Sequence, residues 1–220
     1  MTKHGLYKKV HNIRESLGID LAEYPIRIKE YIGDTTNITT APFETPGLRG
    51  IAISNGIEVP QIILNSNLSI NESNFYCGHE FMHIMLHPPK SHSTFTCYER
   101  VREQQNTFLE WQANEGAAEL LMPYQLLIPE YVSLKKRMLS GFWPYEGDIF
   151  DVLAENFHTT YMIAQHRISS LSYEIQQYEN GISLDRLKIV SKSALVARGI
   201  SVFDESEIAR KICCFYDFSA

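Results

Sequence analysis

The chain has 220 residues, of which 44% are hydrophobic and 21% charged, so it can bury a sizeable core and wholesale disorder is excluded. Its formal net charge of −6 argues against a protein that mainly binds nucleic acid or anionic membrane. The N-terminus lacks the apolar core of a signal peptide and no stretch is long enough to span a bilayer, so we expect a cytoplasmic protein without membrane association.

The first third of the sequence predicts one helix followed by a small sheet. Residues 4–18 carry apolar side chains at helical spacing and finish on a glycine. Residues 51–54 and 60–66 are short, isoleucine-rich runs bounded by Gly, Pro and Asn, which is typical of strands. The pair Asn55-Gly56 between them is a strong turn signal. We therefore expect a small antiparallel or mixed sheet.

Residues 71–87, NESNFYCGHEFMHIMLH, predict the next helix. Asn71 or Ser73 can cap its start, and the pair Pro88-Pro89 must end it because proline donates no amide hydrogen bond. Its side chains are apolar nearly all round, which is typical of a buried helix. Polar side chains inside such a helix need partners, since burying them alone is unfavourable.

His79, Glu80 and His83 form an H-E-x-x-H pattern within this helix. Histidines four residues apart share a helix face, so both rings can reach one metal ion about 2 Å away. Glu80 is then placed to take a proton from water that zinc has made acidic. The pattern therefore favours metal-assisted hydrolysis, although it also occurs by chance in unrelated proteins.

A catalytic zinc site uses three protein ligands, and residues 107–122, TFLEWQANEGAAELLM, predict a second helix that can supply the third. This helix offers three carboxylates, Glu110, Glu115 and Glu119. Glu110 and Asn114 share a face, so one could bind the metal while the other hydrogen-bonds a ligand histidine. Alternatively, Thr107-x-x-Glu110 matches a capping box, in which Glu110 only reaches a backbone amide. Spacing alone leaves both alternatives open.

His87 continues the histidine face by one more turn. Eight residues of helix separate it from His79 by about 12 Å, so we expect it beside the ligands rather than among them. Residues 88–106 predict a less regular stretch. His92 within it is another candidate ligand, but only its proximity to the H-E-x-x-H pattern in the sequence supports that role.

The chain from about residue 148 predicts only helices. A pair near 149–178 resembles a helix-turn-helix, with a tight turn near His158-Thr159. Residues 147–180 hold five acidic residues against one arginine, Arg167, which is the opposite of what DNA phosphates require. We therefore expect residues 126–220 to be a helical annex without direct nucleic acid binding, after a first domain of residues 1–125.

Two motifs in order make the chain resemble the ImmA/IrrE family of zinc metallopeptidases. The first is HEFMHIMLH after Phe75, and the second is ExxANxxAAxLLMP, from Glu110 to Pro123. The resemblance extends to the strands before the first motif and to the helical tail, over residues 1–175. It implies a zincin-like α+β fold, with the sheet packed on the two motif helices and the annex following. Since no repressor-type DNA-binding domain precedes the motifs, the chain resembles the stand-alone form.

Carried over residue by residue, the resemblance implies that His79, His83 and Glu110 bind Zn²⁺. It also implies that Glu80 is the general base and that Asn114 supports a ligand histidine. The sequence departs from the family pattern at Gly78, where alanine is common, and at Gly116, where a bulky aromatic residue is usual. Neither position is a ligand, so these departures concern packing and pocket shape.

The resemblance further implies limited proteolysis of a regulatory protein, often a helix-turn-helix repressor of a prophage or mobile element, under stress. Such a protease would bind its target extended along a sheet edge, which residues 50–54 or 61–66 could supply. The alternative is a non-proteolytic binding module that sequesters a transcription factor or toxin. In that case zinc would have four protein ligands, with His87 or Cys77 in the fourth position.

Overall fold

The computed structural model describes residues 1–87 and 93–215, so the predicted stop at Pro88-Pro89 and the candidate His92 lie outside the described residues. The chain forms two compact units: Val10–Leu121 is one, and Met1–Lys9 together with the chain from Met122 onward is the other. The first contains a sheet and helices and the second is helical, which confirms the predicted α+β class. The domain boundary at residue 125 stays a prediction.

A four-stranded sheet organises the first unit. Its strands are β1 Asn37–Ala41, β2 Leu48–Ser54, β3 Gln61–Asn65 and β4 Ser93–Tyr98, in the order β1-β3-β2-β4. β1 is parallel to β3 and the other neighbours are antiparallel, so the sheet is mixed. The predicted strands correspond to β2 and β3, and Gly56 takes a positive φ of 75° in the turn between them.

The expectation that residues 50–54 or 61–66 offer a sheet edge to a substrate is wrong. β2 and β3 are the two inner strands, and the edges are β1 and β4. Neither edge strand is predicted from the sequence, and β4 falls in the stretch read as loose. Both are threonine-rich and lack a clean alternation of buried and exposed positions, so the period-2 signal of a strand is weak in them.

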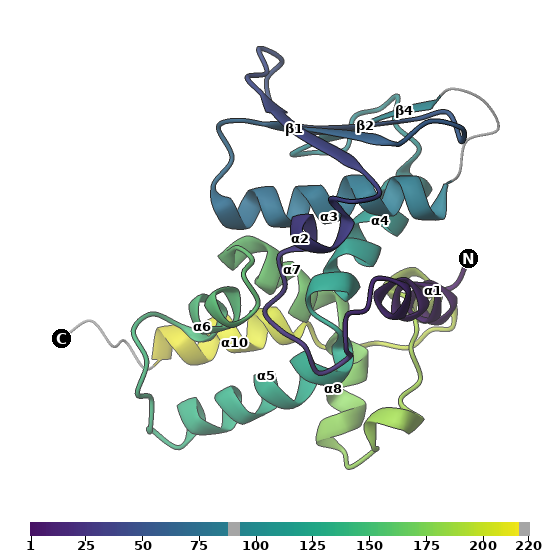
Figure 1. The fold of residues 1–220 in the computed structure, drawn as a ribbon. Coiled ribbons are helices and arrows are strands. Elements are labelled where there is room, and N and C mark those ends of the chain that lie inside the picture. Colours follow the sequence, from purple (N-terminus) through teal and green to yellow (C-terminus); the bar gives the residue numbers. More distant parts are fainter. Residues whose placement is uncertain (88–92, 216–220) are drawn as a thin grey trace. The chain divides into compact units, whose positions relative to one another are not determined.

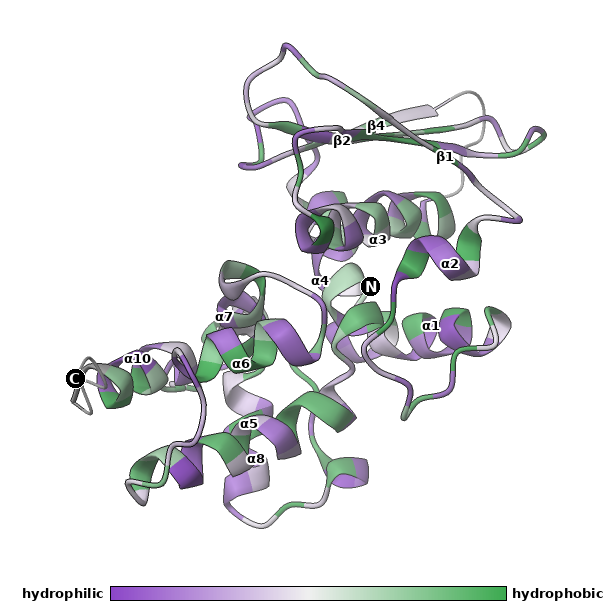
Figure 2. Cartoon of the chain, turned by 60° about the vertical axis from the view of Figure 1, so that its left-hand side comes forward, coloured by the Kyte–Doolittle hydropathy of each residue, from purple (hydrophilic) through white to green (hydrophobic). Residues whose placement is uncertain are grey.

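Two helices, α3 Ile70–Leu86 and α4 Thr107–Leu121, carry the predicted motifs. α3 lies across one face of the sheet and packs against α4 (Figure 1). Hydrophilic and hydrophobic residues are mixed along α3 (Figure 2), and its buried residues include His79, Glu80 and His83 as well as apolar side chains. Its cap is Ser69, which forms a capping box with Glu72, so the expected cap at Asn71 or Ser73 is wrong. The helix begins one residue before the predicted stretch.

α2 Ile28–Ile32 and the part of α1 Lys3–Ser16 from Val10 onward also belong to this unit. α1 confirms the helix predicted at the N-terminus, and Gly18 follows it with a φ of 72°. α2 lies next to α3. Arg14, which is 1% exposed, donates to the carbonyl oxygen of Leu120 at the end of α4. That contact satisfies a carbonyl group that the helix end leaves without a partner.

The second unit is made of helices in the part of the chain that the structure describes. They are α5 Tyr124–Leu139, α6 Ile149–Asn156, α7 Tyr161–Ser170, α8 Ser172–Glu179, η1 Leu184–Arg186, α9 Lys192–Ala197 and α10 Glu205–Phe215. The helical annex is thus confirmed as a helical region. Within residues 1–87 and 93–215, every helix is too short or too polar to cross a bilayer.

α6 and α7 form the predicted pair with a tight turn. His158 adopts a φ of 47° in that turn, and α6 begins with a capping box at Asp148. Arg167 on α7 is 1% exposed and donates to the carbonyl oxygen of Met122 and the hydroxyl of Tyr7. The single arginine of residues 147–180 is therefore buried in contacts within its own unit.

Candidate metal centre

The fold brings the three predicted ligands, His79, His83 and Glu110, into one buried group. The Nε2 atoms of the two histidines on α3 lie 3.1 Å apart. Glu110 on α4 places Oε2 3.4 Å from the Nε2 of His79 and Oε1 3.5 Å from the Nε2 of His83. Nitrogen and oxygen ligands about 2.0 Å from a tetrahedral ion lie roughly 3.3 Å from one another. The three side chains thus fit one metal ion, and their role as ligands stays a prediction.

The electrostatics of this group favour the protonation states that bind metal. Burial lowers the pKa of His83 to about 4, so its ring is neutral at pH 7. Burial alone would raise the pKa of Glu110, but hydrogen bonds and charge interactions with His79 and His83 outweigh it and lower the pKa to about 2. A neutral imidazole and an ionised carboxylate are the forms in which these residues coordinate a cation.

Each ligand histidine is held through its second ring nitrogen. The Nδ1 of His79 lies 3.0 Å from Oδ1 of Asn114 on α4, where the resemblance places a supporting residue. The Nδ1 of His83 lies 3.1 Å from Nδ1 of His87, whose Nε2 lies 2.8 Å from Oε1 of Gln112. These contacts orient both Nε2 atoms toward Glu110 and keep His87 beside the ligand group. The spacing of residues along the sequence gives no reason to select Gln112 as a residue of the site.

The carboxylate of Glu80 lies between the ligand group and the sheet, within 4.8 Å of a ring nitrogen of His79 and next to Gly50. It is fully buried, and neither carboxylate oxygen has a hydrogen-bond partner, although the backbone of Cys97 and of Ala52 faces it. Burial, followed by the charge of Glu110, raises the pKa of Glu80 well above 4.5. A raised pKa suits a carboxylate that must accept a proton near neutral pH.

Gly50 on β2 makes room for this carboxylate. A Cβ atom added at Gly50 would lie 2.7 Å from Oε1 of Glu80, closer than real Cβ atoms come to a neighbour, and 3.0 Å from its Cγ, which is tighter than most real contacts. Any larger residue at position 50 would therefore have to displace the Glu80 side chain. The sequence hides this relation, because the two residues are 30 positions apart and only the fold brings them together.

β4 supplies two further side chains that the sequence does not point to. The ring of Phe95 stacks on the ring of His83 with centroids 4.6 Å apart and an interplanar angle of 12°. Cys97, two residues along and on the same strand face, joins His79 and Glu80 in a second group of potential ligand atoms within 4.8 Å of one another. Burial, together with the charges of Glu80 and Glu110, raises the pKa of the Cys97 thiol.

Cys77, one of the residues considered for a fourth ligand, lies outside both groups of potential ligand atoms found among the described residues. Its burial raises the pKa of the thiol to about 12. His87, the other such residue, contacts His83 and Gln112. Cys97 is the cysteine that lies near His79, in a group with Glu80 and not with His83 or Glu110.

Two local features allow α4 to present Glu110 to α3. The side chain of Asn106 accepts from the amides of Phe108 and Leu109 and so caps the helix start, leaving Glu110 to face the histidines. The metal-ligand alternative for Glu110 therefore agrees with the geometry and the capping-box alternative does not. A Cβ at Gly116 would lie 3.1 Å from Met82 on α3, so this glycine permits the close approach of the two helices.

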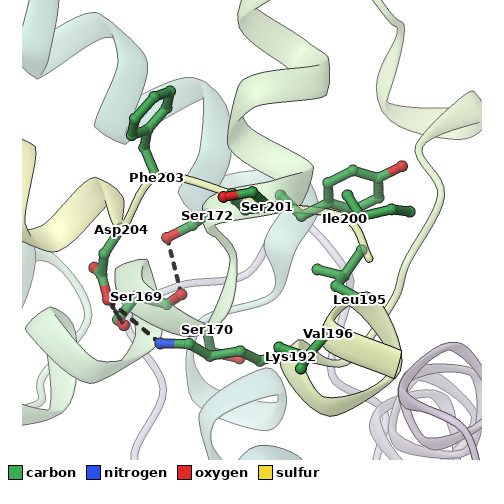
Figure 3. Close-up of a pocket in the computed structure, with 12 residues that line it drawn as sticks. Ser169, Ser170, Ser172, Lys192, Leu195, Val196, Ile200, Ser201, Phe203 and Asp204 are labelled. Atoms are coloured by element: carbon green, nitrogen blue, oxygen red, sulfur yellow. Dashed lines mark hydrogen bonds and ion pairs between the residues drawn. The ribbon is translucent and has the colours of Figure 1, made fainter. Parts of the chain in front are cut away.

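The helical unit contains a separate pocket of about 170 Å³ (Figure 3). Ser169 donates to Asp204 across 2.6 Å, and Lys192 lies 3.8 Å from the same carboxylate. Apolar side chains form much of the remaining wall, namely Leu195, Val196, Ile200, Val202 and Phe203. None of the predicted site residues lines this pocket.

The chain matches the model of a known protein family. The model of the family Peptidase_M78, described as IrrE N-terminal-like domain, matches residues 35–169. That range includes the sheet, both motif helices and every predicted site residue. No curated protein matches the chain.

Proposed function

The chain belongs to the Peptidase_M78 family of IrrE N-terminal-like domains, and we propose that it is a zinc-dependent, site-specific endopeptidase. Family membership supports a metallopeptidase-like function in general. The observation that carries the finer proposal is the buried group of His79, His83 and Glu110 next to Glu80, a fully buried carboxylate without a hydrogen-bond partner. Nitrogen and oxygen ligands of this kind suit zinc.

Each residue of the group has a part in peptide hydrolysis. Zinc, when bound, supplies a positive charge that polarises a carbonyl and acidifies water. His79, His83 and Glu110 would hold the ion, with Asn114 and His87 fixing the two rings. Glu80 would accept a proton from the attacking water and pass it to the amine nitrogen as the peptide bond breaks. Water is thereby added across the bond and Glu80 ends as a carboxylate.

Gly50→Ala should test the position of Glu80 without changing its chemistry. The added Cβ would meet the carboxylate at 2.7 Å, and a flexible side chain can move to relieve that contact. We therefore expect a folded protein that retains zinc but loses cleavage by about 10²-fold, the loss expected from a misplaced reacting group. Activity assays with zinc analysis would check this. Full activity in the Ala variant would show that Glu80 does not need its present position.

A peptide substrate would pair with β4. β4 is an edge strand, and its residues Phe95 and Cys97 lie beside the candidate metal group. An extended peptide that adds to this edge would bring its backbone past the site through main-chain hydrogen bonds. The side chain of Gln105 donates to the carbonyl oxygen of Thr96 in β4, so the peptide would have to displace this contact.

Hydrogen exchange should locate the bound peptide. In the Glu80→Gln protein with an uncleaved substrate, we expect slower exchange in residues 93–98 and little change in residues 50–54 and 61–65, which already lie inside the sheet. Slower exchange in residues 37–41 alone would place the peptide on the opposite edge and contradict this arrangement.

We infer the class of substrate from the family resemblance: a cytoplasmic regulatory protein, with a helix-turn-helix repressor of a prophage or mobile element as the first candidate. The experiment compares new protein N-termini by mass spectrometry in host cells that express this protein or its Glu80→Gln form under DNA damage. A terminus that depends on Glu80 would identify the substrate. Capture of one partner by both forms without any new terminus would instead favour a binding module that sequesters its partner.

A further inference from the structure

Cys97 lies against the proposed catalytic group in a way that the peptidase reaction does not require. Its Sγ, a ring nitrogen of His79 and a carboxylate oxygen of Glu80 lie within 4.8 Å of one another. The side chain is 3% exposed. Thiolate is a preferred ligand of zinc, so this thiol stands where it can compete for the ion.

A second observation points to a cation at the same place. Both oxygens of Glu80 lack hydrogen-bond partners although the side chain is fully buried. Such a carboxylate is unfavourable unless a positive charge faces it. Cys97 thus lies beside a buried carboxylate that a nearby cation would stabilise.

The pairing of β4 with β2 places the Cys97 side chain next to His79 and Glu80. Cys97 pairs with Gly50, and the register of β2 against β4 shifts by one residue between Leu48 and Gly50. Such irregularities redirect neighbouring side chains and recur next to active sites. Because Phe95 stacks on His83 from the same strand face, β4 is fixed alongside α3 with its thiol next to His79.

We propose that Cys97 is an inhibitory fourth ligand of the zinc ion held by His79, His83 and Glu110. This inference rests on the proposed function, which supplies the ion. On coordination the S–H bond breaks, a sulfur–zinc bond forms and the proton leaves to solvent. Among the described residues, Cys97 shares a group of potential ligand atoms with His79 and Glu80 but not with His83 or Glu110. The thiol therefore has to move toward these two ligands to complete a tetrahedral site.

The consequence is a closed resting state. Zinc with four protein ligands has no open position for water or a carbonyl, whereas zinc with three does. Cys97 belongs to β4, the edge strand on which a substrate is expected, so a small displacement of β4 by an added peptide would withdraw the thiol. Substrate binding would thereby open the site and restore the thiol proton from solvent.

X-ray absorption at the zinc edge of the full-length zinc-loaded protein tests this directly. We expect one sulfur neighbour at about 2.3 Å with the remaining neighbours at about 2.0–2.2 Å. Cys97→Ala should lose the sulfur neighbour, retain one zinc per chain and cleave substrate faster. Cys77→Ala, a change at the other buried cysteine of the site region, should retain the sulfur neighbour.

The outcomes separate this inference from the proposed function. Bound zinc with nitrogen and oxygen neighbours alone in the unaltered protein would overturn the role of Cys97 and leave the peptidase proposal standing. A sulfur neighbour that persists in Cys97→Ala would assign it to another residue. A chain that binds no zinc, with His79, His83 and Glu110 intact, would overturn both.

Discussion

Glu80→Gln is expected to lower the rate of substrate cleavage by about 10²–10⁴-fold while zinc content stays at one ion per chain. Glutamine keeps the shape of the side chain but cannot accept the proton of water. The carboxylate is absent from the ligand group of His79, His83 and Glu110, so its loss leaves all three ligands in place. Single-turnover cleavage of an identified substrate, with metal analysis of the same sample, measures both quantities.

The matched control for this substitution is Glu119→Gln. Glu119 is also fully buried, but its Oε1 lies 2.7 Å from Nε2 of His11, away from the candidate metal group. We expect this variant to retain both zinc and activity. Undiminished cleavage by Glu80→Gln would contradict the proposed mechanism. Among the described residues, Glu80 is the carboxylate near the ligands that is buried and has no hydrogen-bond partner, so no other residue is a clear candidate for the general base.

The parts of the site that lie within one helix could be predicted from the sequence. A spacing of four residues places His79 and His83 on one face whatever the tertiary structure, and the apolar surroundings indicate burial. The hairpin of β2 and β3 is equally local, since Asn55-Gly56 encodes its turn. The choice of Glu110 needed either the family resemblance or the fold, because spacing also permitted a capping role.

The parts that depend on contacts between distant segments could not be predicted. β4 is a short threonine-rich strand, and its pairing with β2 depends on the tertiary fold. Because the sequence of this stretch predicts irregular structure, it does not identify Phe95 and Cys97 as site residues. Because the sequence does not predict β1 and β4 as strands, it places β2 and β3 at the edges of the sheet. Gly50 has no local signal either, since its importance arises only where β2 passes the Glu80 side chain.

Glu110→Gln should abolish tight zinc binding, which makes it the most damaging substitution expected after Glu80→Gln. Loss of a residue that merely orients a ligand typically weakens metal affinity by about 10–100-fold, so loss of a ligand should exceed roughly 100-fold. The variant also removes the negative charge that contacts His79 and His83 at 3.4 and 3.5 Å. Competition for zinc with a chromophoric chelator gives the affinity.

Thermal unfolding provides an independent measurement of the same loss. A ligand present at 100 times its dissociation constant stabilises the folded state by about 2.7 kcal/mol, so zinc should raise the Tm of the unaltered protein. That increase should vanish in Glu110→Gln and persist in Glu119→Gln, whose carboxylate lies nine residues further along α4. If Glu119→Gln lost the zinc-dependent increase in Tm and Glu110→Gln kept it, the third ligand would be misassigned. The close approach of α4 to α3 at Gly116 would then not serve to bring Glu110 to the histidines.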